Sequence, residues 1–166
     1  MAKHSDFKKA LKTFKKIAIC SHDAGGAEVL SEITKSIKKN YSFTLLGPAK
    51  KIYSRKIGNY NISSFKKAID NSEVLLTSTS IRSSLELKAI SYAKKKQIRS
   101  ISILDHWSGY LQRFIFCNKK ILPDEIWTLD KEAFKKAKKI FPDLKLRLFE
   151  NPYLSKIKIS QSRKFN

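Results

Sequence analysis

The sequence predicts an α/β fold with a single doubly wound, mostly parallel sheet that carries helices on both faces. Short apolar runs alternate with amphipathic segments along almost the whole chain, and this alternation is typical of parallel strands joined by helices. The chain has 166 residues, which is enough to bury the core of one domain. Crossovers between parallel strands are right-handed, so a doubly wound sheet is the expected topology.

The elements are expected in a regular order. Residues 16–21 form an apolar run that ends at a glycine turn, and Leu30, Ile33 and Ile37 then repeat at helical spacing within a helix at 25–39. Further strands are predicted at residues 41–46, 73–77, 101–104, 125–129 and 145–149. Further helices are predicted at residues 64–70, 83–96 and 130–140, with a broken helix between 49 and 63.

Two of these helices begin with capping signals. Ser83 and Glu86 have the S-x-x-E spacing of a capping box, in which the two side chains satisfy free backbone N–H groups at the helix start. Asp130 is expected to cap the helix that follows it, because aspartate is among the favoured N-cap residues.

The chain divides into a main domain and two terminal segments. Residues 1–15 predict an amphipathic basic helix, which either packs against the domain or anchors the protein to a membrane surface. Residues 16–154 form the α/β domain. Residues 155–166 are expected to be a basic C-terminal tail.

The formal net charge is +21, from 35 Lys and Arg residues against 14 Asp and Glu residues. Such an excess suits a nucleic acid, an anionic lipid surface or a phosphorylated small ligand, and it also describes a solvated lysine coat. Only six of these residues are arginines. Because the planar arginine side chain is the usual reader of guanine edges, this composition disfavours a base-reading protein.

A cytoplasmic location is expected, with peripheral contact to a membrane left open. The two cysteines, Cys20 and Cys117, do not form a CxxC pair, and no apolar stretch reaches the length of a membrane span. Neither H-x-x-x-H nor H-E-x-x-H is present, so no metal ion is predicted, and no cofactor is predicted either.

The candidate site lies at the carboxyl ends of the strands, where open parallel sheets bind ligands. The first strand is followed by His22, Asp23, Gly25 and Gly26. A glycine turn that opens a helix brings backbone N–H groups together and can bind an anion. The full G-x-G-x-x-G fingerprint is absent, so a purely structural corner is the alternative.

Other polar residues follow the later strands. The predicted ligand-binding residues there are Thr77, Ser78, Thr79, Ser80, Trp107, Arg113 and Asn151. Hydroxyl groups donate hydrogen bonds to phosphate or sugar, and an aromatic ring with a basic side chain stacks on a base or a sugar. Helix capping by the serines and a cover over the end of the sheet are the alternatives.

The catalytic candidates are His22, Asp23, Asp105 and His106. A carboxylate beside an imidazole orients the ring and raises its pKa, so each pair can supply acid–base chemistry. Neighbouring strand residues point to opposite faces, however, so His22 and Asp23 need not touch. The alternative for Asp23 is a plain N-cap of its helix.

The order of the motifs resembles a known family. The motifs are H-D-A-G-G-A, T-S-T-S-I-R-S-S-L-E, I-L-D-H-W-x-x-Y-x-x-R-F, L-P-D-E-I-W and N-P-Y, and together they span roughly residues 16–154. They are similar to the N-terminal Rossmann-like domain of GT-B glycosyltransferases and related nucleotide-sugar enzymes of bacterial surface-polysaccharide assembly. The resemblance implies that this domain binds a nucleotide sugar or a phosphorylated sugar, with the loop residues named above in the cleft.

One departure from that family is large. A complete GT-B enzyme has two such domains, and this chain has one. The resemblance therefore implies a partner chain that supplies the second domain, a homo-oligomer, or a repurposed single domain. Two other hypotheses remain open: a non-enzymatic protein that binds nucleic acid or an anionic surface, and an interaction subunit of a two-chain transferase.

Overall fold

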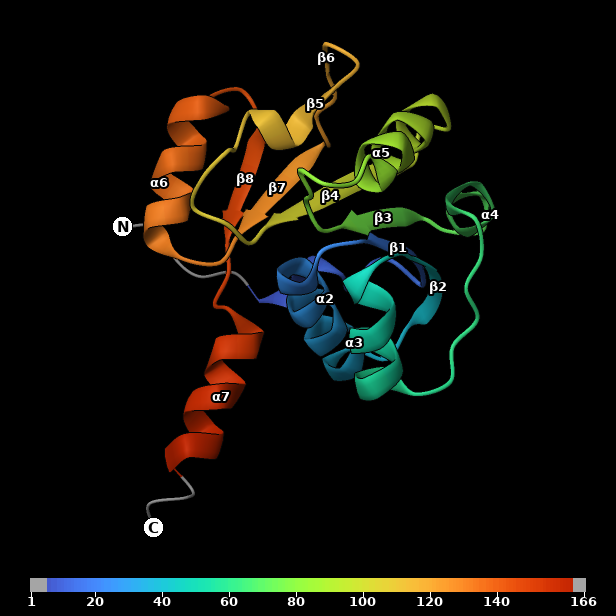
Figure 1. Cartoon of the computed structure of the whole chain (residues 1–166), viewed down its shortest axis with the longest axis vertical. Helices are drawn as coiled ribbons and strands as arrows, with labels where there is room; N and C mark the ends of the chain where they lie inside the picture. The colour runs from blue at the N-terminus through green and yellow to red at the C-terminus, as the bar shows by residue number, and fades with distance from the viewer. Residues whose placement is uncertain (1–5, 163–166) are drawn as a thin grey trace.

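The main strands form one parallel sheet, which confirms the predicted fold class (Figure 1). The computed structural model describes residues 6–162, with side chains as far as residue 157. The strand order is β2-β1-β3-β4-β7-β8, and the paired strands of this sheet are all parallel. Its strands are β1 (Lys16–Ser21), β2 (Asn40–Leu45), β3 (Val74–Thr77), β4 (Arg99–Leu104), β7 (Glu125–Thr128) and β8 (Lys145–Leu148).

Helices cover both faces of this sheet, as Figure 1 shows for α2 and α3 on one face and α5 on the other. The strand β1 explains the arrangement, because Ile17 and Ile19 enter the core on one face while Ala18 and Cys20 enter the core on the other. The α-helices are α1 (Phe7–Ala10), α2 (Ala24–Ser36), α3 (Pro48–Ile57), α4 (Phe65–Asp70), α5 (Leu85–Lys95), α6 (Lys131–Ile140) and α7 (Pro152–Ser162).

The direction of strand addition reverses at β1. This strand pairs with β2 on one side and with β3 on the other. Residues of α2 belong to the core on one face of the sheet, and residues of α5 belong to the core on the other. The loops after β1 and β3 therefore diverge, and in doubly wound sheets the crevice between such loops is the place where ligands bind.

A small hairpin interrupts the alternation and is absent from the predicted elements. Strands β5 (Ile115–Phe116) and β6 (Lys119–Lys120) pair in antiparallel fashion after the 3₁₀ turn η1 (Gln112–Phe114). The two turn residues, Cys117 and Asn118, have φ angles of 49° and 59°. Such turns are normally signalled by Asn-Gly or Asp-Gly, and the Cys-Asn pair gives no such signal.

Both terminal segments contact the domain where the structure describes them. The ring of Phe7 in α1 stacks on Phe149 with centroids 4.2 Å apart, so this part of the N-terminal segment packs against the core. Residues 1–5 of the predicted helix lie outside the described residues. In α7, Lys156 forms an ion pair with Glu32 of α2 at 3.2 Å. Across residues 6–162, no helix has both the length and the apolar character needed to cross a membrane.

Candidate functional site

A cavity of about 510 Å³ opens at the carboxyl ends of β1, β3 and β4, and we call it the switch-point cavity. Its volume falls within the range of small-molecule sites, which is roughly 300–1,000 Å³. Residues from the loops after β1, β2, β3 and β4 meet there. The lining residues are His22, Asp23, Ala24, Gly25, Pro48, Ile81, Arg82, His106 and Arg113.

The first feature of the cavity is an oriented imidazole. His22 Nδ1 lies 2.7 Å from Asp23 Oδ1, and the hydroxyl of Ser80 donates to the same oxygen at 2.9 Å. Because the carboxylate accepts from Nδ1–H, the neutral imidazole keeps its lone pair on Nε2, which is the atom of a general base. Asp23 occupies the N-cap position of α2 but makes no side-chain cap, so its carboxylate serves the histidine and not the helix.

The second feature is the start of α2, which comes unusually close to two neighbouring loops. A Cβ at Gly26 would collide with the Cβ of Ser78, and a Cβ at Gly25 would collide with the carboxylate of Asp105. Both positions therefore need glycine for close approach and not for an unusual backbone angle. Asp23 does not cap the helix, and Ala24 and Gly25 at its start are exposed and line the cavity, so this end of α2 faces a ligand there.

The third feature is a pair of buried charged side chains on the loop after β4. The side chain of Asp105 is 4% exposed, and within the described part of the chain its Oδ2 has no hydrogen-bond partner. Burial raises the pKa of this carboxyl, and the positive charges of His106 and Arg113 oppose that rise. Arg113 is 5% exposed and donates to the carbonyl of Ser108 at 3.2 Å and, at the limit of hydrogen-bond distance, to Thr79.

Glu86 corrects one sequence prediction. The capping box is not formed: Ser84 is the N-cap of α5 and makes no side-chain cap. The Glu86 carboxylate instead accepts from the backbone N–H of His22 at 2.8 Å and from the hydroxyl of Ser78 at 3.1 Å. The Ser21 and Ser78 hydroxyls also bond at 2.8 Å. Both donors bond to Oε1, and within the described residues the buried Oε2 has no hydrogen-bond partner.

We predict that Glu86→Gln flattens the pH dependence of stability. Burial raises the pKa of Glu86, so its favourable contribution is complete below the pKa of the unfolded chain and is lost as the pH rises through the folded pKa. Glutamine cannot ionise, and it keeps an acceptor for the N–H of His22. One such group changes the free energy of unfolding by at most about 1.4 kcal/mol per pH unit.

Urea unfolding of both proteins over a range of pH measures this effect. Asp105 has a raised pKa as well and keeps part of the slope in the variant. Parallel curves for the variant and the original protein would contradict the prediction.

Several predicted site residues do not line the switch-point cavity. Thr77 is fully buried and bonds to the hydroxyl of Ser102 at 2.8 Å, inside the sheet. Ser80 donates to Asp23 and Thr79 accepts from Arg113, so these two hydroxyls contact lining residues without lining the cavity themselves. Ser78 donates to Glu86, and neither Gly26 nor Asp105 is part of the lining. Trp107 lines a different groove on the other side of its loop.

Asn151 caps α7 by accepting from the N–H groups of Tyr153 and Leu154 at 3.0 and 3.3 Å. We expect Asn151→Ala to lower the free energy of unfolding by about 1 kcal/mol, the usual effect of losing an N-cap. Ligand affinity should not change, because this residue is not part of the cavity. Thermal unfolding of Asn151→Ala and Asn151→Ser tests the cap, since serine should restore most of the stability.

Five contributors to the site are absent from the residues predicted by the sequence: Glu86, which supports His22, and the lining residues Ala24, Pro48, Ile81 and Arg82. A signal for Glu86 is present, because it lies at i, with Ala89, Ile90 and Ala93 at i+3, i+4 and i+7 on the apolar stripe of α5. A carboxylate on such a stripe is rarely buried without a partner. Arg82 and Pro48 carry no comparable pattern, and only the meeting of their loops places them in the cavity.

The chain has been compared with models of protein families, with curated proteins and with solved structures. None of the three comparisons gives a match. The resemblance to GT-B domains therefore stays a prediction.

Proposed function

We propose that this domain binds a phosphorylated sugar or a nucleotide sugar in the switch-point cavity, as part of bacterial glycan assembly. The observation that carries the proposal is Arg113. This buried arginine lines the cavity, and among the side chains described up to residue 157 it has no carboxylate within ion-pair distance. Its charge acts on the buried carboxylate of Asp105, but the two side chains do not form a direct ion pair. Buried charges are normally paired directly, so an anionic ligand would supply the ion pair that this guanidinium lacks.

Two further features support an anion at the same place. The first-turn N–H groups of α2 are free of a side-chain cap, and the helix start adds partial positive charge. Arg82 lines the same cavity and extends the positive lining towards solvent. A phosphate between the α2 start and the guanidinium of Arg113 would receive charge-assisted hydrogen bonds from both.

The two His–Asp pairs supply the acid–base groups of the proposed reaction. His22, held by Asp23, would remove a proton from an attacking hydroxyl through Nε2. His106, which lines the cavity and has Asp105 beside it at 3.6 Å, would donate a proton to the phosphate oxygen of the leaving group as the bond between that oxygen and the sugar carbon breaks. These roles describe a transfer reaction at a sugar, in which this chain acts as one half of a GT-B-like transferase.

A specific observation favours the related candidate, an interaction subunit of a two-chain transferase. Large apolar side chains at the rim of the same sheet edge are exposed, with Ile81 61% and Trp107 69% accessible. Exposed apolar groups beside a ligand site are typical of a surface that a second domain or a second copy covers. The nucleic-acid alternative has only the dispersed lysines to support it.

Isothermal titration tests the proposal. The full chain is titrated with uridine diphosphate sugars, sugar 1-phosphates and the corresponding free sugars. We expect the phosphorylated compounds to bind and the free sugars not to bind, because the recognised group is the anion. Equal heats for free and phosphorylated sugars, or no binding at millimolar ligand, would contradict it.

A further inference from the structure

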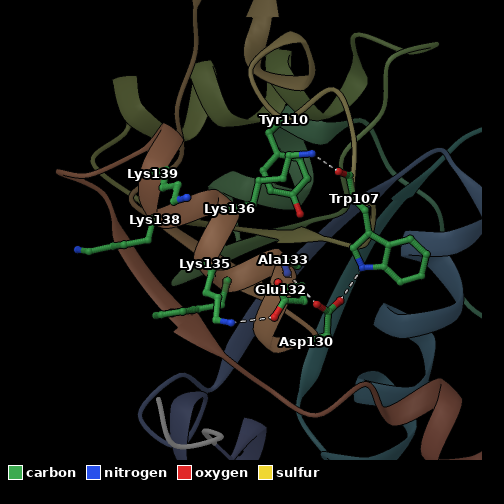
Figure 2. Close-up of a pocket in the computed structure, with 10 residues that line it drawn as sticks. Trp107, Tyr110, Asp130, Glu132, Ala133, Lys135, Lys136, Lys138 and Lys139 are labelled. Atoms are coloured by element: carbon green, nitrogen blue, oxygen red, sulfur yellow. Dashed lines mark hydrogen bonds and ion pairs between the residues drawn. The ribbon is translucent and has the colours of Figure 1, made fainter. Parts of the chain in front are cut away.

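A second hollow lies on the other side of the loop that follows β4. It has a volume of about 900 Å³ and faces the outer surface of α6 (Figure 2). We call it the Trp107 groove. The lining residues are Trp107, Tyr110, Asp130, Glu132, Ala133, Phe134, Lys135, Lys136, Lys138 and Lys139.

The Trp107 ring is fixed in a position that exposes it to solvent. Its indole N–H donates to Asp130 at 2.8 Å, and Lys136 donates to its backbone carbonyl at 2.6 Å (Figure 2). Because one bond fixes the ring and the other fixes the backbone of the same residue, Trp107 loses little conformational freedom when a ligand stacks on it. A freely rotating surface tryptophan would offer no such platform.

The groove also holds an unsatisfied polar group. Tyr110 is 2% exposed, and its hydroxyl has no hydrogen-bond partner in the described part of the structure. Figure 2 shows this hydroxyl pointing into the space between the labelled residues, and the Lys136 ammonium lies over the ring, 5.3 Å from its centroid. A buried hydroxyl without a partner is unfavourable in the free protein and becomes satisfied when a ligand supplies one.

The charges select the class of ligand. Four lysines face this groove together with the carboxylates of Asp130 and Glu132. The lysines attract an anionic chain, whereas the two carboxylates oppose any anion. Asp130 already accepts from Trp107 and Ala133, and Glu132 from Lys135, but a carboxylate oxygen has a further lone pair for a ligand hydroxyl. A sugar chain carrying carboxylate groups offers such hydroxyl groups between its charges, whereas a DNA strand has none along its backbone.

From these observations we infer that the Trp107 groove binds an acidic oligosaccharide, with a sugar ring stacked on Trp107 and a hydroxyl bonded to Tyr110. The consecutive residues His106 and Trp107 line the switch-point cavity and the groove respectively. An oligosaccharide in the groove would therefore end beside the cavity, as an acceptor would; this last step rests on the proposed function.

The test uses the full chain and an oligogalacturonate, with a maltooligosaccharide and an oligothymidylate of similar length as comparison probes. Trp127 is 1% exposed, so acrylamide quenching of tryptophan fluorescence reports mainly on Trp107. We expect the oligogalacturonate to protect the fluorescence and to bind more weakly as salt is added. The neutral sugar should bind at least about tenfold more weakly.

Three variants assign the binding to the groove. Trp107→Ala removes the fluorescent reporter, so its affinity is measured by titration calorimetry; it should be about tenfold lower through the lost stacking. Tyr110→Phe should lower it about fivefold while the free energy of unfolding stays the same or rises, because phenylalanine removes an unsatisfied group. Lys138→Gln with Lys139→Gln should weaken binding more than Lys94→Gln with Lys95→Gln, a change of equal charge on α5.

Other outcomes would overturn the inference. Unchanged quenching in the presence of oligogalacturonate would exclude binding of an acidic oligosaccharide in the Trp107 groove. Tighter binding of oligothymidylate through the same residues would show that the groove binds nucleic acid instead. Equal effects of the two lysine pairs show only general charge attraction. The result is separate from the proposed function, because binding of sugar phosphates in the switch-point cavity is measured without the oligosaccharide.

Discussion

Arg113→Met is expected to lower the affinity for a sugar phosphate about hundredfold, because the variant loses charge-assisted hydrogen bonds inside a buried site. Methionine fills a similar length of apolar volume, so the packing beside Phe114 should survive. Titration calorimetry measures the affinity, and circular dichroism melting shows whether the variant is folded. The carbonyl of Ser108 and Thr79 lose a donor, so a modest loss of stability accompanies the change.

Two companion variants make this result specific. Arg55→Met removes the same charge from an exposed arginine that pairs with Glu28, and it should change affinity little because solvent screens that charge. Arg113→Lys keeps the charge without the planar fork and should give an intermediate affinity. A folded Arg113→Met that binds sugar phosphate as tightly as Arg55→Met would remove the main support for the proposed function.

Gly26→Ala is expected to destabilise the fold by about 3 kcal/mol or more, although alanine is the better helix former. The new methyl group would meet the Cβ and the Cα of Ser78, and neither atom can move without a shift of β3 or α2. Chemical denaturation with urea measures the free energy of unfolding. Loss of the hydrogen bond between Ser21 and Ser78 would accompany the shift.

The neighbouring glycine is the matched control. Gly25→Ala adds the same methyl group in the same helical turn, but there it meets the end of the Asp105 side chain, which can rotate. We expect a smaller change in stability and a larger change in ligand binding, because Gly25 itself lines the switch-point cavity and the displaced carboxylate lies beside His106, which lines it too. Equal destabilisation by the two variants would show that close approach to Ser78 is not the reason for Gly26.

The two predictions separate folding from binding. Gly26 is a buried residue in the first turn of α2, packed against Ser78 just after β3, whereas Arg113 lines the cavity from the turn η1. Substitution at Gly26 should therefore lower mainly the free energy of unfolding, and substitution at Arg113 should lower mainly the affinity for the ligand. A Gly26 variant that changed only ligand affinity, together with an Arg113 variant that changed only the free energy of unfolding, would contradict both the packing role of Gly26 and the anion-binding role of Arg113.

Periodicity is sufficient for most of the fold. The strand predicted at 16–21 coincides with β1, and the predicted cap at Asp130 is confirmed by its bond to the N–H of Ala133 at 2.7 Å. These features depend on residues close in sequence, whose spacing and capping chemistry are visible in the chain. The helix predicted at 25–39 is too long, since α2 ends at Ser36.

The alternation of strands and helices, and the polar loops at the carboxyl ends of the strands, can be predicted from the residues alone. The roles of those loop residues become visible only in the folded chain: Glu86 supports His22 instead of capping α5, Arg113 is buried at the cavity, and Trp107 lines a different groove from His106. This difference arises because local spacing fixes the period of an element, whereas burial and pairing of a charge depend on residues brought together from distant parts of the chain.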